Sequence, residues 1–256
     1  MIWDALKTFS LVRNLLRLLS DRDPRHFAAL DGIRVLSMWW IILGHTYFFA
    51  AMIGFDDWTY FLPPAGDMAT FTFQAVSGAF FAVDTFFWLS GFLVAYILMK
   101  KLQKWPQLAV GKLLRFYPLF FLHRYMRITP VLLLILLFEW LVFPSLSSGP
   151  FWGRSSVIEN ASCQDYWWTN LLFINNFIPT SHLDSCMSWT WFLAVDTQLY
   201  LLTPLLVFIY LKRPKVGLAV LVTLLAGSTL CIALITNAYN LTAHMFDLVG
   251  LLRFHC

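Results

Sequence analysis

The chain has 256 residues, of which 59% are hydrophobic and only 12% are charged, with a formal net charge of +4. Soluble globular domains carry about a quarter charged residues, so this composition excludes a single core inside a charged, water-soluble shell. Four cysteines are too few for a disulfide scaffold. The sequence has no glycine-rich phosphate loop and no paired-cysteine or His-Glu-x-x-His pattern. We therefore expect no metal site, no bound cofactor and no nucleic-acid partner.

Residues 1–29 are predicted to form a separate N-terminal segment. Polar and basic residues interrupt the apolar ones between residues 1 and 20, so the continuous apolar core of a secretory signal peptide is missing. At helical spacing the polar positions share one broad face; they are Lys7, Arg13, Asn14 and Arg17. This pattern predicts a basic amphipathic helix on the cytosolic surface of a membrane.

Residues 30–256 contain a series of apolar runs long enough to cross a bilayer core, which takes about 20 residues. The runs occupy residues 33–53, 80–99, 129–146, 191–211 and 216–236, and a shorter one begins near Ala243. We therefore predict an all-α, polytopic transmembrane helix bundle with a long outer loop over residues 147–190. Asp31 is expected to cap the first span, and Thr129-Pro130 to begin the third.

The basic residues orient these spans. Most of the 18 lysines and arginines fall in three segments, residues 1–34, 100–127 and 212–215. The segments that alternate with them, residues 54–79, 147–190 and 237–242, contain Arg154 as their only basic residue. The positive-inside rule therefore places the N-terminus in the cytosol, in either the plasma membrane or the endoplasmic reticulum.

The predicted outer side also carries the modification patterns. N-glycosylation sequons begin at Asn160 and Asn240, and both fall outside, where a glycan can be added. Cys163 and Cys186 share the long outer loop, so an oxidised pair is expected there, with two free thiols as the alternative.

The first span contains two ionisable residues. Arg34 begins the span and His45 follows eleven residues later, which is about three turns or 16 Å of helical rise. Both side chains therefore lie on one face, the arginine at the cytosolic boundary and the histidine near the midplane. Ionisable groups at membrane depth are costly and usually mark a functional path. The alternatives are an arginine that reaches the headgroups and a structural histidine.

Further polar residues lie in the second and fourth spans. Asp84 and Asp196 fall in the outer part of their spans, whereas Ser90 falls near the midplane, level with His45. A histidine and a serine at one depth are compatible with a base and a nucleophile. Close helix packing by Ser90-Gly91 explains the serine better. Hydrogen bonds to neighbouring helices or to water are the alternative role for the aspartates.

The segment 100–127 contains seven basic residues and no acidic one, interleaved with aromatic residues. Arg124 and Arg127 are three residues apart and therefore neighbours on a helix. Such a surface suits anionic lipid headgroups. It also suits a polyphosphate, because guanidinium groups bind phosphate oxygens in a forked geometry.

Several motifs in a fixed order resemble the acyltransferase-3 family. They are Leu30-Asp31-Gly32-Ile33-Arg34, Gly44-His45, Val83-Asp84, Leu89-Ser90-Gly91-Phe92, Arg124-Tyr125-Met126-Arg127 and the stretch from Ala194 to Tyr200. The stretches Arg34-Val35-Leu36-Ser37-Met38 and Leu43-Gly44-His45-Thr46-Tyr47 are most similar to the animal branch of nose-resistant-to-fluoxetine proteins.

The resemblance implies a bundle of roughly ten membrane helices, of which this chain supplies about half and ends within one. The large extracellular cysteine-bearing domain expected ahead of the first motif in this branch is also missing. We therefore expect an incomplete, C-terminally truncated bundle.

The resemblance also implies an activity, the transfer of an acyl group from a cytosolic acyl-CoA donor to a hydroxyl of a lipid, sterol or glycan. It assigns donor contacts to Arg34, Arg124 and Arg127 and the role of general base to His45. Asp196 takes the place of the family's acidic residue. A carrier for lipids or lipophilic compounds is an alternative function, as is an inactive fragment that associates with other membrane helices.

Overall fold

The computed structural model describes residues 10–20, 28–53, 70–104, 109–148, 162–180 and 185–240. Every regular element in these ranges is a helix. The chain divides into two units, Met1–Leu36 and Ser37–Cys256. Lys7, Asn160 and the apolar run near Ala243 lie outside the described residues.

The first unit contains helix α2 (Leu11–Leu19) and the start of helix α3 (Ala28–Ile53). The side chain of Ser10 caps α2 by accepting a hydrogen bond from the backbone N–H of Arg13. Large apolar side chains of α2 are exposed; they are Leu11, Val12, Leu15, Leu16 and Leu19. Their exposure beside basic residues is typical of an interfacial helix, and its position on a membrane surface stays a prediction.

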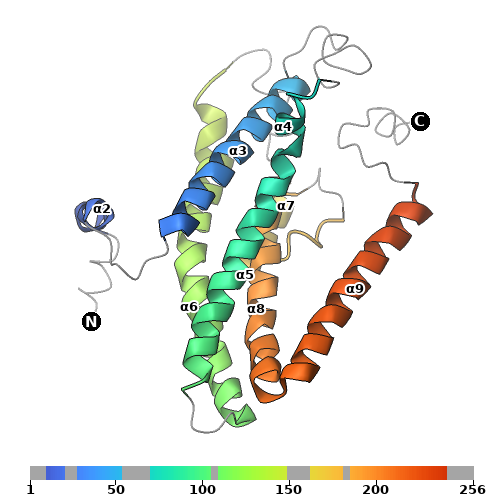
Figure 1. Ribbon diagram of the computed structural model, residues 1–256. Helices are drawn as coiled ribbons and strands as arrows, with labels where there is room; N and C mark the ends of the chain where they lie inside the picture. The colour runs from blue at the N-terminus through green and yellow to red at the C-terminus, as the bar shows by residue number, and fades with distance from the viewer. Residues whose placement is uncertain are drawn as a thin grey trace. The chain divides into compact units, whose positions relative to one another are not determined.

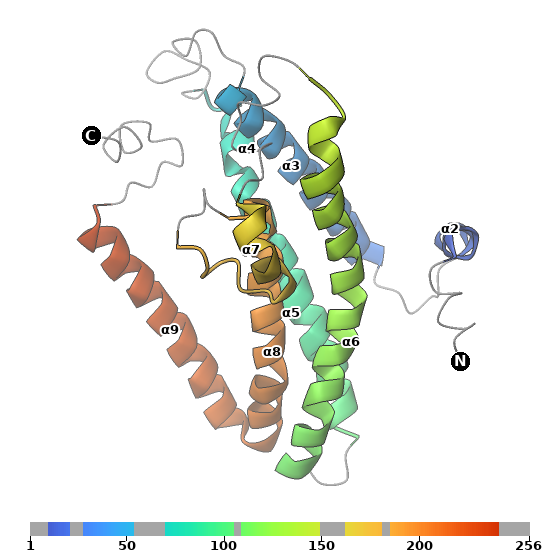
Figure 2. The same ribbon diagram turned by 180° about the vertical axis from the view of Figure 1, so that it is seen from behind.

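The second unit holds the remaining helices (Figures 1 and 2). In chain order they are α4 (Gln74–Ser77), η2 (Gly78–Phe80), α5 (Phe81–Leu102), α6 (Val110–Leu137), η3 (Phe138–Val142), η4 (Phe143–Ser145), α7 (Cys163–Leu171), η6 (Ser188–Thr190), α8 (Trp191–Lys212) and α9 (Pro214–Ala238).

Among the described residues, five helical segments are long and apolar enough to cross a membrane. They are Ala28–Ala50, Gln74–Leu102, Val110–Ser145, Ser188–Lys212 and Pro214–Ala238. The prediction of an all-α, multi-pass bundle is therefore confirmed, and the chain is an integral membrane protein.

Two predicted helix starts are wrong. The third span begins at Val110 rather than near Thr129, and Pro130 lies inside α6 together with Pro118. The basic segment continues the helix because its aromatic residues pack against α5 and α8, which stabilises the helix on the N-terminal side of Thr129. Asp31 is not a cap either, since α3 begins at Ala28 and Asp31 lies in its first turn.

Three helices of the second unit form its packed centre. Helices α5 and α8 lie side by side and run in the same direction, since Phe87 contacts Phe192 and Leu98 contacts Val207 further along. Helix α6 lies against both and runs in the opposite direction relative to α8. Helix α9 follows α8 after a tight turn, and Figures 1 and 2 show it leaning away from α8 toward its C-terminal end.

Candidate active site

An ion pair between two apolar spans is the centre of the candidate site. Arg124 of α6 donates through Nη2 to Oδ2 of Asp196 of α8, and the two side chains are only 12% and 13% exposed. The guanidinium also lies over the ring of Tyr200, 4.1 Å from the centroid. Tyr200 in turn stacks on Phe120, with ring centroids 4.1 Å apart. A carboxylate and an aromatic face together fix the position of this cation.

Arg124 and Asp196 each need the other, because both side chains are mostly buried between apolar spans. A single buried charge in an apolar environment is strongly unfavourable, and an ion pair offsets that cost only when its geometry is good. Nε of Arg124 is nevertheless buried without a hydrogen-bond partner in the described part of the chain, and so is Oγ1 of Thr197, next to Asp196. Donor capacity therefore remains at the site for a bound group or for water.

The described residues between α6 and α8, 162–180 and 185–190, are called the outer segment after their predicted side, and they contact this centre. Gln198 donates through Nε2 to the carbonyl of Phe173 and to Oδ1 of Asn176, both at 2.9 Å, and accepts from Nδ2 of Asn176 at 3.2 Å. The ring of Phe173, whose backbone is left-handed with φ 57°, meets Tyr125 edge to face. Tyr125 follows Arg124 in α6, so the outer segment packs directly against the turn that carries the arginine.

A buried polar network holds the outer segment together. Cys163 and Cys186 form a disulfide with Cα atoms 4.4 Å apart, and both residues are fully buried. Asn170 donates to the carbonyl of Cys186, Asn175 donates to Oγ1 of Thr190, and Thr190 donates to Oδ1 of Asn170. The predicted loop 147–190 is thus an ordered structure around α7 in the part that can be described.

His45 lies elsewhere in the second unit. Its Nδ1 is 2.9 Å from the carbonyl oxygen of Ile41, and its ring lies 6.0 Å from that of Phe49. A carbonyl oxygen only accepts, so in the neutral ring Nδ1 carries the proton and Nε2 keeps its lone pair. None of the residues placed by the structure forms a hydrogen bond with Nε2.

The predicted common depth of His45 and Ser90 is wrong. Gly44 packs so closely on Ala79 that a Cβ at Gly44 would lie 2.4 Å from that of Ala79. Ser90 lies eleven residues further along the same helical segment, about 16 Å away by helical rise. The error arises because α4 and η2 extend the second span to Gln74, so α3 meets the N-terminal part of that span.

Among the described residues, no hydrogen bond or ion pair links the remaining predicted residues to the Arg124–Asp196 pair. Arg34 pairs with Asp31 at 3.0 Å, one turn earlier in α3. Arg127 and Asp84 are exposed and Ser90 is half-buried, and within the described ranges none of the three has a hydrogen bond or an ion pair. Arg124 and Arg127 therefore differ in environment, one held by Asp196 and the other open to a ligand.

The sequence reasoning missed the aromatic and amide residues around the pair. Tyr200 and Gln198 belong to the stretch beginning at Ala194, and Phe120 belongs to the aromatic-rich segment 100–127. The sequence therefore contains both patterns, but it does not show which residues of the two contact each other.

Asn240 lies in the turn after α9. No group of three His, Cys, Asp or Glu residues suited to a metal occurs among the residues that the structure places.

These features define a class of protein: a multi-pass membrane protein with an ion pair between two spans, whose arginine lies over an aromatic ring. Residues 27–252 match the acyltransferase domain family known as acyltransferase-3. The chain belongs to this family.

Individual relatives agree with the family assignment. Nose resistant to fluoxetine protein 6 of Caenorhabditis elegans is 40% identical over 241 residues, which is 91% of this chain and 28% of that protein. Regulator of hypoxia-inducible factor 1 of the same organism is 28% identical over 247 residues, covering 90% and 44%. Peptidoglycan O-acetyltransferase OatA of Listeria monocytogenes is 28% identical over 160 residues, covering 59% and 24%.

The chain therefore spans less than half the length of each of these relatives. No solved structure matches it.

Proposed function

We propose that this chain is part of a membrane acyltransferase that transfers an acyl group from a cytosolic acyl-CoA donor to a hydroxyl acceptor, in or across the plasma membrane or the endoplasmic reticulum membrane. The buried Arg124–Asp196 pair carries the proposal, because charges kept inside apolar spans of a protein from this family are costly unless they serve the reaction. A relative named as a peptidoglycan O-acetyltransferase supports a hydroxyl acceptor.

Donor binding is assigned to the exposed cations. Arg127 and the lysines of the basic segment offer charges for the phosphates of acyl-CoA, and Arg34 adds a guanidinium at the predicted cytosolic end of α3. Arg124, engaged by Asp196, serves instead to position α6 against α8 and offers its Nε to the donor. The phosphates and the thioester of acyl-CoA are separated by a long pantetheine arm, which suits a base placed away from the cations.

His45 is assigned the role of general base. Nε2 accepts the proton of the acceptor hydroxyl while that oxygen attacks the thioester carbonyl carbon. The carbon–sulfur bond then breaks, and the leaving CoA thiolate takes the proton from the imidazolium. The products are the ester of the acceptor and free CoA, and the histidine returns to its starting state.

His45→Gln in the full-length protein, reconstituted in vesicles, tests this role. Acyl transfer is expected to fall by about two to four orders of magnitude, the usual contribution of a general base. Binding of a thioether analogue of acyl-CoA is expected to stay unchanged, because glutamine keeps the polarity and size of the side chain.

Near-normal turnover of the folded variant would remove His45 from the mechanism. Transport of lipids that persists in this variant, with no acyl transfer in the wild type, would replace the proposed activity with that of a carrier. A structural histidine would instead show itself as lost thermal stability with unchanged turnover per folded molecule.

A further inference from the structure

The turn between α8 and α9 is strongly basic. Lys212, Arg213 and Lys215 are all exposed, and Nζ of Lys212 lies 5.8 Å from the centroid of the Phe208 ring. Helix α9 contains no acidic residue over its whole length. The positive charge of this turn is therefore not neutralised from within α9.

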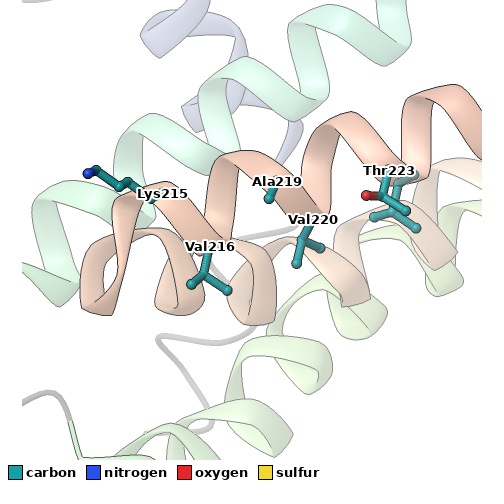
Figure 3. Close-up of a pocket in the computed structure, with 6 residues that line it drawn as sticks. Lys215, Val216, Ala219, Val220 and Thr223 are labelled. Carbon is teal, nitrogen blue, oxygen red and sulfur yellow. The ribbon is translucent and has the colours of Figure 1, made fainter.

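A shallow, open groove begins at this turn and runs along one face of α9 (Figure 3). It has a volume of about 440 Å³ and is lined by Lys215, Val216, Ala219, Val220, Thr223 and Leu224. These residues recur at helical spacing, and the distance from the first to the last is about 14 Å of helical rise. Lys215 supplies the charge at one end, and the remaining lining is almost entirely apolar.

Helix α9 leaves this face open. Gly217 approaches Tyr210 so closely that a Cβ would lie 2.5 Å from its Cα, which pins the start of α9 to α8. Beyond that point the described residues of α9 are exposed, apart from the half-buried Val220. Of the residues that line the groove, only Val220 is therefore half-buried, and the others are exposed.

We propose that the basic turn and the groove bind one anionic phospholipid, with its phosphate at Lys212, Arg213 and Lys215 and one acyl chain along Val216–Leu224. A partner helix would fit the apolar lining equally well, but it would cover the charge of Lys215 without a counter-charge. A phospholipid supplies a negative headgroup for the basic end of the groove and an apolar chain for the rest of its lining. The positive-inside prediction places the turn at the cytosolic leaflet, which is rich in anionic lipids.

The test is the ratio of phosphatidylserine to phosphatidylcholine retained by the full chain, measured by native mass spectrometry after purification from an equal mixture. Each basic residue near an anionic lipid surface contributes about a fivefold preference. The triple variant Lys212→Gln, Arg213→Gln and Lys215→Gln is therefore expected to lower the ratio by at least about tenfold. The comparison variant, Lys104→Gln, Lys112→Gln and Arg115→Gln, removes the same charges from the other basic segment and is expected to lower the ratio by less, because the groove along α9 does not adjoin those residues.

A second pair of variants tests the groove itself. Thr223→Phe fills the groove and is expected to lower phosphatidylserine retention several-fold, whereas Thr229→Phe adds the same volume on another face of α9 and is expected to have no effect. Equal losses in the two triple variants, or no loss in Thr223→Phe, would overturn the proposal. Displacement of phosphatidylserine by acyl-CoA at equal concentration would also overturn it and assign the groove to the donor.

Discussion

Helices α8 and α9 are neighbours in sequence and similar in length, with 22 and 25 residues, yet they treat their polar side chains in opposite ways. In α8 the side chains of Asp196 and Gln198 bond to α6 and to the outer segment. In α9 the hydroxyls of Ser228 and Thr229 donate back to the carbonyl of Leu225 in their own helix, both at 2.9 Å. These side chains of α8 are thus satisfied across helices, whereas those of α9 are satisfied within their own helix.

The largest expected effect comes from breaking the ion pair of α8. Asp196→Asn leaves the cation of Arg124 buried without its counter-charge, which is expected to lower the free energy of unfolding by about 3–5 kcal/mol. Unfolding by a denaturing detergent in mixed micelles, followed by circular dichroism, measures this change.

The double variant Arg124→Leu with Asp196→Leu is the control. Replacing a buried pair by apolar side chains is often close to neutral, so most of the lost stability is expected to return. Equal losses in the single and double variants would show that the pair is not the source of the effect.

The disulfide of the outer segment gives the next largest effect. Cys163 and Cys186 are separated by 23 residues, and in the chain-entropy account a loop of this size stabilises by about 3 kcal/mol. The double variant Cys163→Ser with Cys186→Ser is expected to lose about that amount.

Cys231 of α9 is a free, exposed cysteine and supplies the comparison. Cys231→Ser is expected to leave the unfolding transition unchanged, because its side chain faces away from the packed helices. A reducing agent should reproduce the loss in the wild type and in Cys231→Ser. Loss of stability in Cys231→Ser itself would contradict the description of α9 as unpacked.

The smallest effect lies within α9. A Cβ at Gly217 meets the backbone of Tyr210, whereas a Cβ at Gly227 meets nothing within 4 Å. Gly217→Ala is expected to cost about 1–3 kcal/mol through overpacking, and Gly227→Ala is expected to cost nothing, since alanine favours a helix. Thermal unfolding of the two variants, measured side by side, checks the difference. Equal transition temperatures would contradict a close contact that is confined to the start of α9.

The spans and their number could be predicted from the sequence, because each apolar run carries its own signal. The start of α6 could not be, since aromatic residues such as Phe116 and Phe120 continue the helix only through contacts with other spans. Helix starts read from local capping signals fail wherever packing on one face outweighs them.

The residues of the site could be predicted from the sequence, but the contacts between them could not. The sequence singles out Arg124 and Asp196 separately, but their contact depends on the relative depth of α6 and α8, which no run of apolar residues encodes. The same reason explains the error over His45 and Ser90. The predicted depth of each residue depends on its position within its own span. The contact between Gly44 and Ala79 shifts one span along the other, so the two residues do not lie at the same level.

The two prolines of α6 have a mechanical consequence. Pro118 and Pro130 lack the N–H that would bond to the carbonyls of Leu114 and Met126, so the helix can bend at both points without breaking a hydrogen bond. Beyond Pro130, the side chains of Leu132 and Leu136 are buried in the packed core. The stretch between the prolines carries Arg124, and the bond from Arg124 to Asp196 holds this stretch against α8. The ion pair therefore fixes α6 at the point where the two prolines leave its backbone least constrained.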